Sequence, residues 1–102
     1  MATTSPITFA FTANNQSSPS FTPRAAIRYG NGFNVSISGT FSATIGLFRQ
    51  LPGDSSSTWR LVQSWTAPVE TSFIEYENGT IYQLQSTAYT SGTANGRLGQ
   101  HL

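Results

Sequence analysis

At 102 residues the chain has the length of one compact domain and leaves no room for two. Only 9% of its residues are charged, against a typical ~25%, and it contains no lysine. Serine and threonine replace the missing charges, with 28 residues between them. Aromatic residues make up 13% of the chain, a content that favours a folded core over disorder.

The composition also excludes several classes of function. The net charge is +1 and the five arginines are scattered, so binding of nucleic acid through clustered basic residues is not expected. The absence of cysteine excludes disulfides and thiolate metal sites. No apolar stretch approaches the length of a membrane span, and no signal peptide is visible at the N-terminus.

The first third of the chain predicts two strands joined by a polar segment. Apolar residues alternate over 7–11, which is typical of a half-buried strand. Residues 14–23 are polar and contain two prolines, so they indicate a loop or a loose edge segment. Alternation returns over 24–29, and Gly30-Asn31-Gly32 then predicts a turn.

The clearest strand signal lies between residues 33 and 47. Apolar side chains fall on odd positions and mainly hydroxyl side chains on even ones, as expected when successive side chains point to opposite faces of a sheet. Gly39 interrupts the run. One long strand bent at Gly39 would keep the same parity, but we favour two strands joined by a hairpin loop over 38–40, because strands of ~5–6 residues are typical.

The remaining residues predict further short strands and turns. A polar loop over 51–57 precedes a strand that includes Trp59, Leu61 and Trp65, and Val62 suggests that both faces of this strand are covered. A short strand ends near Tyr76, and Asn78-Gly79 is a favoured hairpin turn. The chain ends with a strand over 80–89, a turn at Ser91-Gly92 and a last strand from Ala94. In the strand over 80–89 we expect Tyr82, Leu84 and Ala88 on one face.

This pattern predicts an all-β fold: an antiparallel two-sheet β-sandwich of about eight strands, with a jelly roll as one arrangement. We expect a single domain. Residues 1–24 would form an N-terminal strand and a polar arm packing on the domain or on a neighbouring subunit, and residues 25–102 would form the sandwich core.

The residues that could carry catalysis are sparse. A Ser-His-Asp triad would have to use His101, the only histidine, and Asp54, the only aspartate, so we expect neither a triad nor a histidine zinc site. Glu70, Glu75 and Glu77 could in principle serve a glycosidase, but a solvated hairpin end beside Asn78-Gly79 explains Glu75 and Glu77 better. The sequence therefore predicts no enzyme, no cofactor and no metal.

Aromatic residues offer a different kind of site. Trp59 and Trp65, with tyrosines such as Tyr29, could form a platform that stacks against sugars. The competing interpretation, which we favour, is that at least one tryptophan fills the core, since each large aromatic side chain buries ~150–250 Å².

A set of turn and strand motifs resembles a known family. The motifs are Gly32-Phe33-Asn34-Val35-Ser36-Ile37-Ser38-Gly39-Thr40-Phe41-Ser42-Ala43-Thr44-Ile45, then Leu47, Arg49 and Ser57-Thr58-Trp59, then Gly79-Thr80-Ile81-Tyr82, Tyr89-Thr90-Ser91-Gly92-Thr93 and Arg97-Leu98-Gly99-Gln100. Over about residues 32–100 this order is similar to small β-sandwich structural proteins of tailed bacteriophages and prophages.

The resemblance implies a non-enzymatic virion protein made in the bacterial cytoplasm, most simply a capsid decoration (cement) protein on the head surface. Its partners would be the major capsid protein or another virion protein, together with copies of itself, such as a trimer. The alternative is a tail, baseplate or fibre component that binds carbohydrate or a receptor. Candidate contact residues are Arg24, Arg28 and Tyr29 near the arm, and Trp59 and Trp65 for the sugar-binding alternative.

Overall fold

The structure, a computed structural model, describes residues 6–23, 31–77 and 79–100. These residues form seven strands and no helix, so the predicted all-β class is confirmed. The strands are β1 (Ile7–Phe11), β2 (Asn31–Ser38), β3 (Phe41–Gln50), β4 (Arg60–Trp65), β5 (Val69–Glu75), β6 (Ile81–Gly92) and β7 (Ala94–Gln100). The strand expected near residues 25–29 lies outside the described residues.

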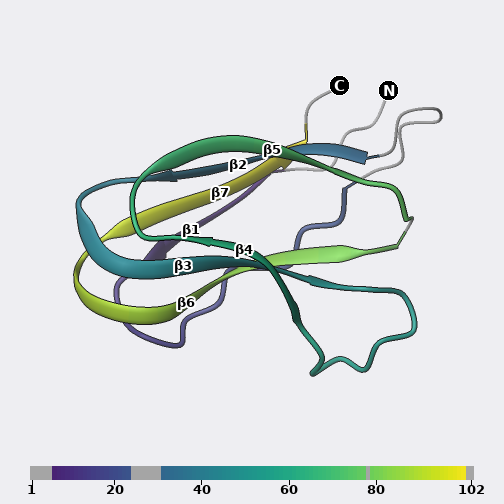
Figure 1. Cartoon of the computed structure of the whole chain (residues 1–102), viewed down its shortest axis with the longest axis horizontal. Helices are drawn as coiled ribbons and strands as arrows, with labels where there is room; N and C mark the ends of the chain where they lie inside the picture. Colours follow the sequence, from purple (N-terminus) through teal and green to yellow (C-terminus); the bar gives the residue numbers. More distant parts are fainter. Residues whose placement is uncertain (1–5, 24–30, 78, 101–102) are drawn as a thin grey trace.

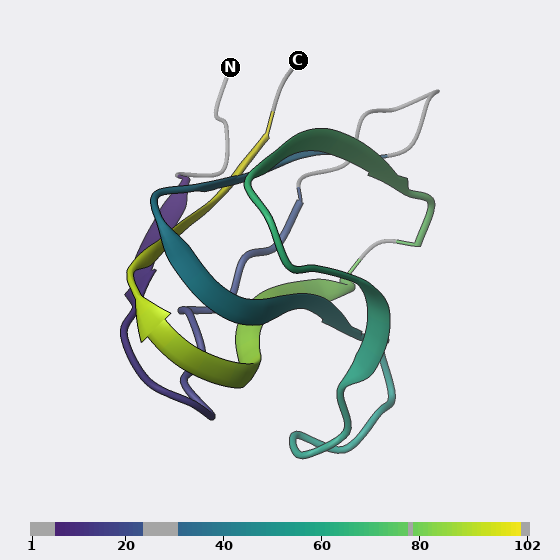
Figure 2. The same ribbon diagram turned by 60° about the vertical axis from the view of Figure 1, so that its left-hand side comes forward.

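The strands form two antiparallel sheets that pack face to face (Figures 1 and 2). Sheet A has four strands in the order β1-β7-β2-β5, and sheet B has three in the order β4-β3-β6. The predicted two-sheet β-sandwich is therefore confirmed. The chain changes sheet between β2 and β3, between β4 and β5, and at both ends of β6.

Two turns predicted as hairpins, and the predicted turn at Ser91-Gly92, are corners between the sheets. Two strands do flank Gly39, as preferred, but β2 and β3 belong to different sheets and do not pair. The same holds for the links at Gly79, between β5 and β6, and at Gly92, between β6 and β7. All three glycines have positive φ, at +105°, +89° and +84°. The local signal correctly predicted the backbone conformation, but it does not reveal which sheet the next strand joins.

Two of these corners lie against each other at one end of the sandwich, on the left in Figure 1. A Cβ atom on Gly39 would lie 2.5 Å from the carbonyl oxygen of Thr93, and one on Gly92 would lie 2.3 Å from that of Thr40. The Thr93 amide donates a hydrogen bond to the Thr40 carbonyl at 3.1 Å. Glycine is thus required at both corners for its conformation and for its lack of a side chain.

The core lies between the two sheets and follows the predicted alternation. Phe33, Val35 and Ile37 of β2 and Ile45 and Leu47 of β3 are at most 1% exposed. Six further buried residues complete the core: Phe11, Phe21, Tyr82, Leu84, Ala94 and Leu98. Odd positions over 33–37 and 45–47 therefore face inward because each strand has one face against the opposite sheet.

Aromatic rings connect the two layers. The Phe33 ring of sheet A lies 4.5 Å from the Tyr82 ring of sheet B, measured between centroids, and 5.9 Å from the rings of Phe21 and Phe73. Tilted and offset ring pairs at such distances contribute about 0.5–1.5 kcal/mol beyond the burial of their area. Phe33 is thus a central contact of the core.

The polar segment before residue 24 follows the edge of sheet B. The amides of Ser18 and Phe21 donate to the carbonyls of Leu84 and Tyr82 in β6, each at 2.8 Å, and the Tyr82 amide donates back to the Phe21 carbonyl at 2.7 Å. Ser86 of β6 is also buried, and its hydroxyl donates to the Ala13 carbonyl. The segment therefore covers the β6 edge of its own chain. The predicted contact of residues 1–24 with a neighbouring subunit stays a prediction.

Strand β4 differs from its prediction. Trp59 precedes the strand, Leu61 is 59% exposed, and five of the six residues of β4 are exposed, so the expectation that both faces are covered is wrong. Ala88 of β6 is also exposed rather than aligned with Leu84, because the pairing of β3 with β6 shifts register between Ser42 and Ile45.

A residue with a side chain loses about 1–2 kcal/mol when its backbone is left-handed. We expect Gly92→Ala to destabilise the fold by more than this amount, because the new Cβ atom would also clash with backbone atoms. Gly53→Ala is the matched control, since Gly53 has φ +92° but no atom within 4 Å of an added Cβ. Thermal unfolding of both variants measures the difference. Equal losses in the two variants would contradict the packed-corner description.

Candidate functional site

The residues suggested for binding from the sequence do not form one described site. Arg24, Arg28 and Tyr29 lie outside the described residues, so the structure does not place them. Trp59 is half-buried in the loop just before β4. The structure therefore leaves the arginine contacts as predictions.

The other aromatic candidates separate into core and surface residues. Trp65 is half-buried, and its ring lies edge-on to Phe73 with centroids 6.2 Å apart. Tyr82 is buried, and the Tyr89 hydroxyl donates to the Gly92 carbonyl at 2.7 Å. Only Tyr76 among these residues is widely exposed, at 79%. Trp65 and Tyr82 thus pack in or beside the core rather than on an exposed sugar-stacking platform.

A charged cluster closes the sandwich at the end opposite the packed corners. Glu75 at the end of β5 is only 5% exposed. One of its oxygens accepts hydrogen bonds from the Tyr82 hydroxyl at 2.6 Å and from Arg49 Nη1 at 3.0 Å, and the other accepts from the Glu77 amide at 3.0 Å. Arg49 and Tyr82 belong to sheet B, so the Glu75 carboxylate connects the two sheets.

These contacts shift the ionisation of the cluster. Burial opposes ionisation of Glu75, but the hydrogen bonds from Tyr82, the Glu77 amide and Arg49 outweigh it and leave the Glu75 pKa below its ordinary 4.5. Burial and the adjacent carboxylate raise the pKa of Tyr82 far above its usual range. Glu75 is therefore held as an anion and Tyr82 as a hydrogen-bond donor.

The expectation that Glu75 lies at a solvated hairpin end is wrong. The link after β5 crosses to the other sheet, so Glu75 turns inward and finds partners there. Glu70 lies on the opposite, outward face of the same strand, where it accepts a hydrogen bond from the Ser36 hydroxyl. Glu70 and Glu75 are thus directed to opposite sides of sheet A and do not form a facing pair of carboxylates.

Asp54 organises the loop between β3 and β4. Its two oxygens accept hydrogen bonds from Arg60 Nε and Nη2, each at 2.9 Å, and the Leu51 amide donates to it at 3.0 Å. Hydrogen bonding from Arg60 and Leu51 lowers the pKa of Asp54 to about 2. Asp54 is thus occupied in shaping a loop, and His101, the histidine that a triad would need, lies outside the described residues.

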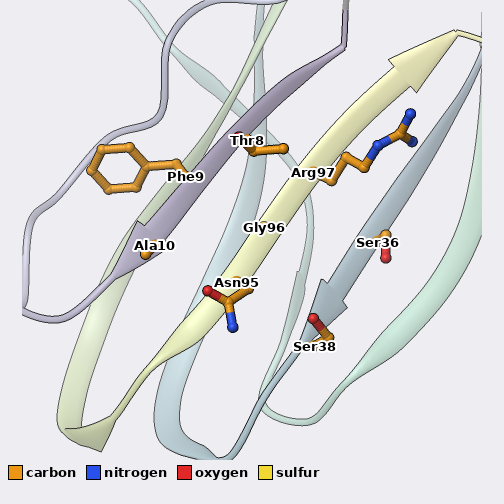
Figure 3. Close-up of a pocket in the computed structure, with 8 residues that line it drawn as sticks. All are labelled: Thr8, Phe9, Ala10, Ser36, Ser38, Asn95, Gly96 and Arg97. Atoms are coloured by element: carbon orange, nitrogen blue, oxygen red, sulfur yellow. The ribbon is translucent and has the colours of Figure 1, made fainter.

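The outward face of sheet A carries a row of polar side chains across four strands. The register places Thr8 of β1 beside Arg97 of β7, Arg97 beside Ser36 of β2, and Ser36 beside Glu70 of β5. Figure 3 shows Thr8, Arg97 and Ser36 projecting from neighbouring strands on one face, with Asn95 alongside. Thr8, Ser36 and Asn95 thus bring hydroxyl and amide groups to this face, beside the charges of Arg97 and Glu70.

Arg97 stands between two shallow hollows on this face. One hollow, of about 530 Å³, is lined by Thr8, Phe9, Ala10, Ser36, Ser38, Asn95, Gly96 and Arg97. The other, of about 630 Å³, is lined by Asn34, Ser36, Glu70, Thr71, Ser72 and Arg97. Ser36 and Arg97 belong to both hollows, so they form the ridge between them.

The described part of the chain contains no group of three or more side chains that could jointly hold a metal ion. It also contains no helix that could span a membrane. No protein-family model matches the sequence, and no curated protein matches it.

Sequence reasoning did not identify the row through Arg97. The alternation of β7 does predict that Arg97 and Leu98 face opposite ways, and hence that Arg97 faces outward. The position of β7 between β1 and β2, which puts Arg97 beside Ser36, follows from strand order and is not encoded locally.

The Glu75 cluster predicts a specific dependence of stability on pH. Because the folded-state pKa of Glu75 lies below 4.5, the carboxylate stabilises the fold above that pH, and this contribution is lost as the pH falls through the lower folded-state value. Glu75→Gln should therefore be less stable than wild type at neutral pH and should lose less stability on acidification.

Denaturant unfolding at several pH values between neutrality and pH about 3 measures this difference. Glu70→Gln removes the same charge from the exposed face but keeps the Glu75 carboxylate. This variant should therefore lose as much stability on acidification as the wild type does. An equal acid-induced loss in Glu75→Gln and wild type would contradict the role assigned to Glu75.

Proposed function

We propose that the protein is a non-enzymatic virion structural protein that decorates and stabilises a phage capsid. The family resemblance suggests this role, and the observation that carries it structurally is the edge strand β4. Among the described residues β4 pairs only with β3, and it exposes Leu61 and Val62 at 59% and 38%. An exposed apolar edge is a ready surface for another protein.

The chain covers one edge strand of sheet B and leaves the other edge strand exposed within the described residues. The chain covers its β6 edge with the segment that carries Ser17 and Phe21, both of which bridge to β6. It leaves β4 uncovered within the described residues and places no lysine there, although lysine is a common means of preventing edge pairing. This contrast supports a partner protein on β4.

The distribution of charge also suits a protein that packs against others. Arg49 pairs with Glu75 between the sheets, and Arg60 pairs with Asp54 in a loop. Much of the outward surface of sheet A consists of serine, threonine and asparagine, which can hydrogen-bond to a partner without the desolvation penalty that buried charges incur. A cement protein needs such a surface on a rigid scaffold.

The alternative is a tail, baseplate or fibre component that binds carbohydrate or a receptor. The exposed ring of Tyr76 favours it, because an exposed aromatic ring can stack on a sugar. Packing of Trp65 against Phe73 and burial of Tyr82 remove two other rings from such a platform. The capsid role is therefore the better supported of the two.

The direct test is the copy number of the chain in density-purified particles from the source organism, determined by quantitative peptide mass spectrometry. The chain has only five arginines and no lysine, so a second protease must supplement trypsin. Abundance comparable to that of the major capsid protein is expected. A few copies per particle would assign the protein to the tail, and absence from particles would overturn a virion role.

Strand β4 provides the mutational prediction. Val62→Lys places a charge on the exposed edge and should weaken binding to capsids that lack the protein at least about tenfold, because covering an unpaired lysine costs more than about 1.4 kcal/mol. Tyr76→Lys is the matched control, since Tyr76 is 79% exposed but lies beyond the end of β5, outside β4 and outside the polar row of sheet A. Co-sedimentation measures both; equal binding by wild type and Val62→Lys would contradict the role of β4.

A further inference from the structure

Two opposite charges on the outward face of sheet A lack an ionic partner. Arg49 and Arg60 each pair with a carboxylate, whereas no described residue forms an ion pair or a side-chain hydrogen bond with Arg97. Glu70 accepts a hydrogen bond from Ser36 but has no basic partner among the described residues. Arg97 and Glu70 lie on either side of Ser36 in one cross-strand row.

The backbone beneath Arg97 fixes how its side chain lies. Gly99 is the next outward-facing residue of β7, and a Cβ atom there would lie 2.5 Å from Nη1 of Arg97. The guanidinium therefore lies along the strand over Gly99, which is buried beneath it. Glycine at this position leaves room for the Arg97 guanidinium to lie over the sheet, and its five N–H donors have no partner among the described side chains.

The surface beside Glu70 is shaped to receive such a group. The hollow of about 630 Å³ is lined by Glu70 and Arg97, with Asn34, Ser36, Thr71 and Ser72 around them. Apart from Arg97, these groups are hydrogen-bond acceptors or small hydroxyls, and Glu70 is the only acidic residue among them. A guanidinium that enters this hollow would meet a carboxylate, the partner that its planar geometry matches best.

We propose that this face binds a second copy of the chain, with Arg97 of each copy seated in the hollow beside Glu70 of the other. A two-fold axis that runs parallel to β2 at Ser36 exchanges the positions of β7 and β5 across the interface. Neighbouring strands are ~4.8 Å apart, so the axis places Arg97 opposite Glu70 of the second copy and forms two identical ion pairs.

The charge pattern favours a second copy over other occupants. The row carries one positive and one negative side chain, so an acidic ligand drawn to Arg97 would be repelled by Glu70, which lies two strands away across β2. A second copy presents the same two charges in the reversed order and satisfies both. The contact does not depend on the virion role and does not use strand β4, and it joins copies in pairs, so a trimer would need another surface.

Charge reversal tests the contact on the purified full-length chain without capsids. Arg97→Glu and Glu70→Arg each replace two attractive contacts by two repulsive ones, and each should raise the dimer dissociation constant at least about tenfold. The double variant exchanges the two charges and should return the constant to near its wild-type value. Sedimentation equilibrium over a range of concentrations measures all four proteins.

The control is Glu77→Arg, which changes charge by the same amount at an exposed residue beyond the end of β5 and should leave dimerisation unchanged. Thermal unfolding at low concentration establishes that each variant folds. The proposal is overturned if wild type stays monomeric up to about 1 mM, or if the double variant dimerises no better than the single ones.

One further outcome would reassign the surface. If wild type binds polygalacturonate and Arg97→Glu does not, while neither dimerises, the face recognises acidic sugars and the self-association proposal fails. The copy number in particles is measured separately, so either proposal can fail while the other stands.

Discussion

The sandwich depends on two glycine corners that pack against each other at one end of the molecule. Gly39 carries the chain from sheet A to sheet B, and Gly92 carries it back. Each corner approaches the other too closely for any side chain, and the Thr93–Thr40 hydrogen bond joins them. Because both corners form at the same end, β7 returns beside β2, and the alternating residues of both strands face one core.

The opposite end is closed by polar rather than steric contacts. There the Glu75 carboxylate accepts hydrogen bonds from Tyr82 and Arg49 of the other sheet. Removing one partner from such a buried group leaves the rest unsatisfied, which makes the cluster costly to disrupt. Glu75 thus holds the two layers together, whereas Arg97 and Glu70 of the outer face have no ionic partner among the described residues.

Sequence patterns predicted the layer architecture well because it depends on local alternation. The residues over 33–37 and 45–47 face the core as expected, and the glycine turns have the expected positive φ. Local patterns do not reveal strand order: they predict hairpins at Gly39 and Gly79, where the chain crosses between sheets, and they place Glu75 in solvent, although it is buried. The row through Arg97 was missed for the same reason, since it assembles residues from four separate strands.

Two surfaces that no described residue covers, the β4 edge and the outward face of sheet A, are the ones that we propose for assembly. Hydrogen–deuterium exchange of the free and particle-bound chain tests that claim most directly, because unpaired edge amides exchange rapidly until a partner covers them. Binding should slow the exchange of amides in residues 60–65. Unchanged exchange along β4, with protection confined to other segments, would contradict the account.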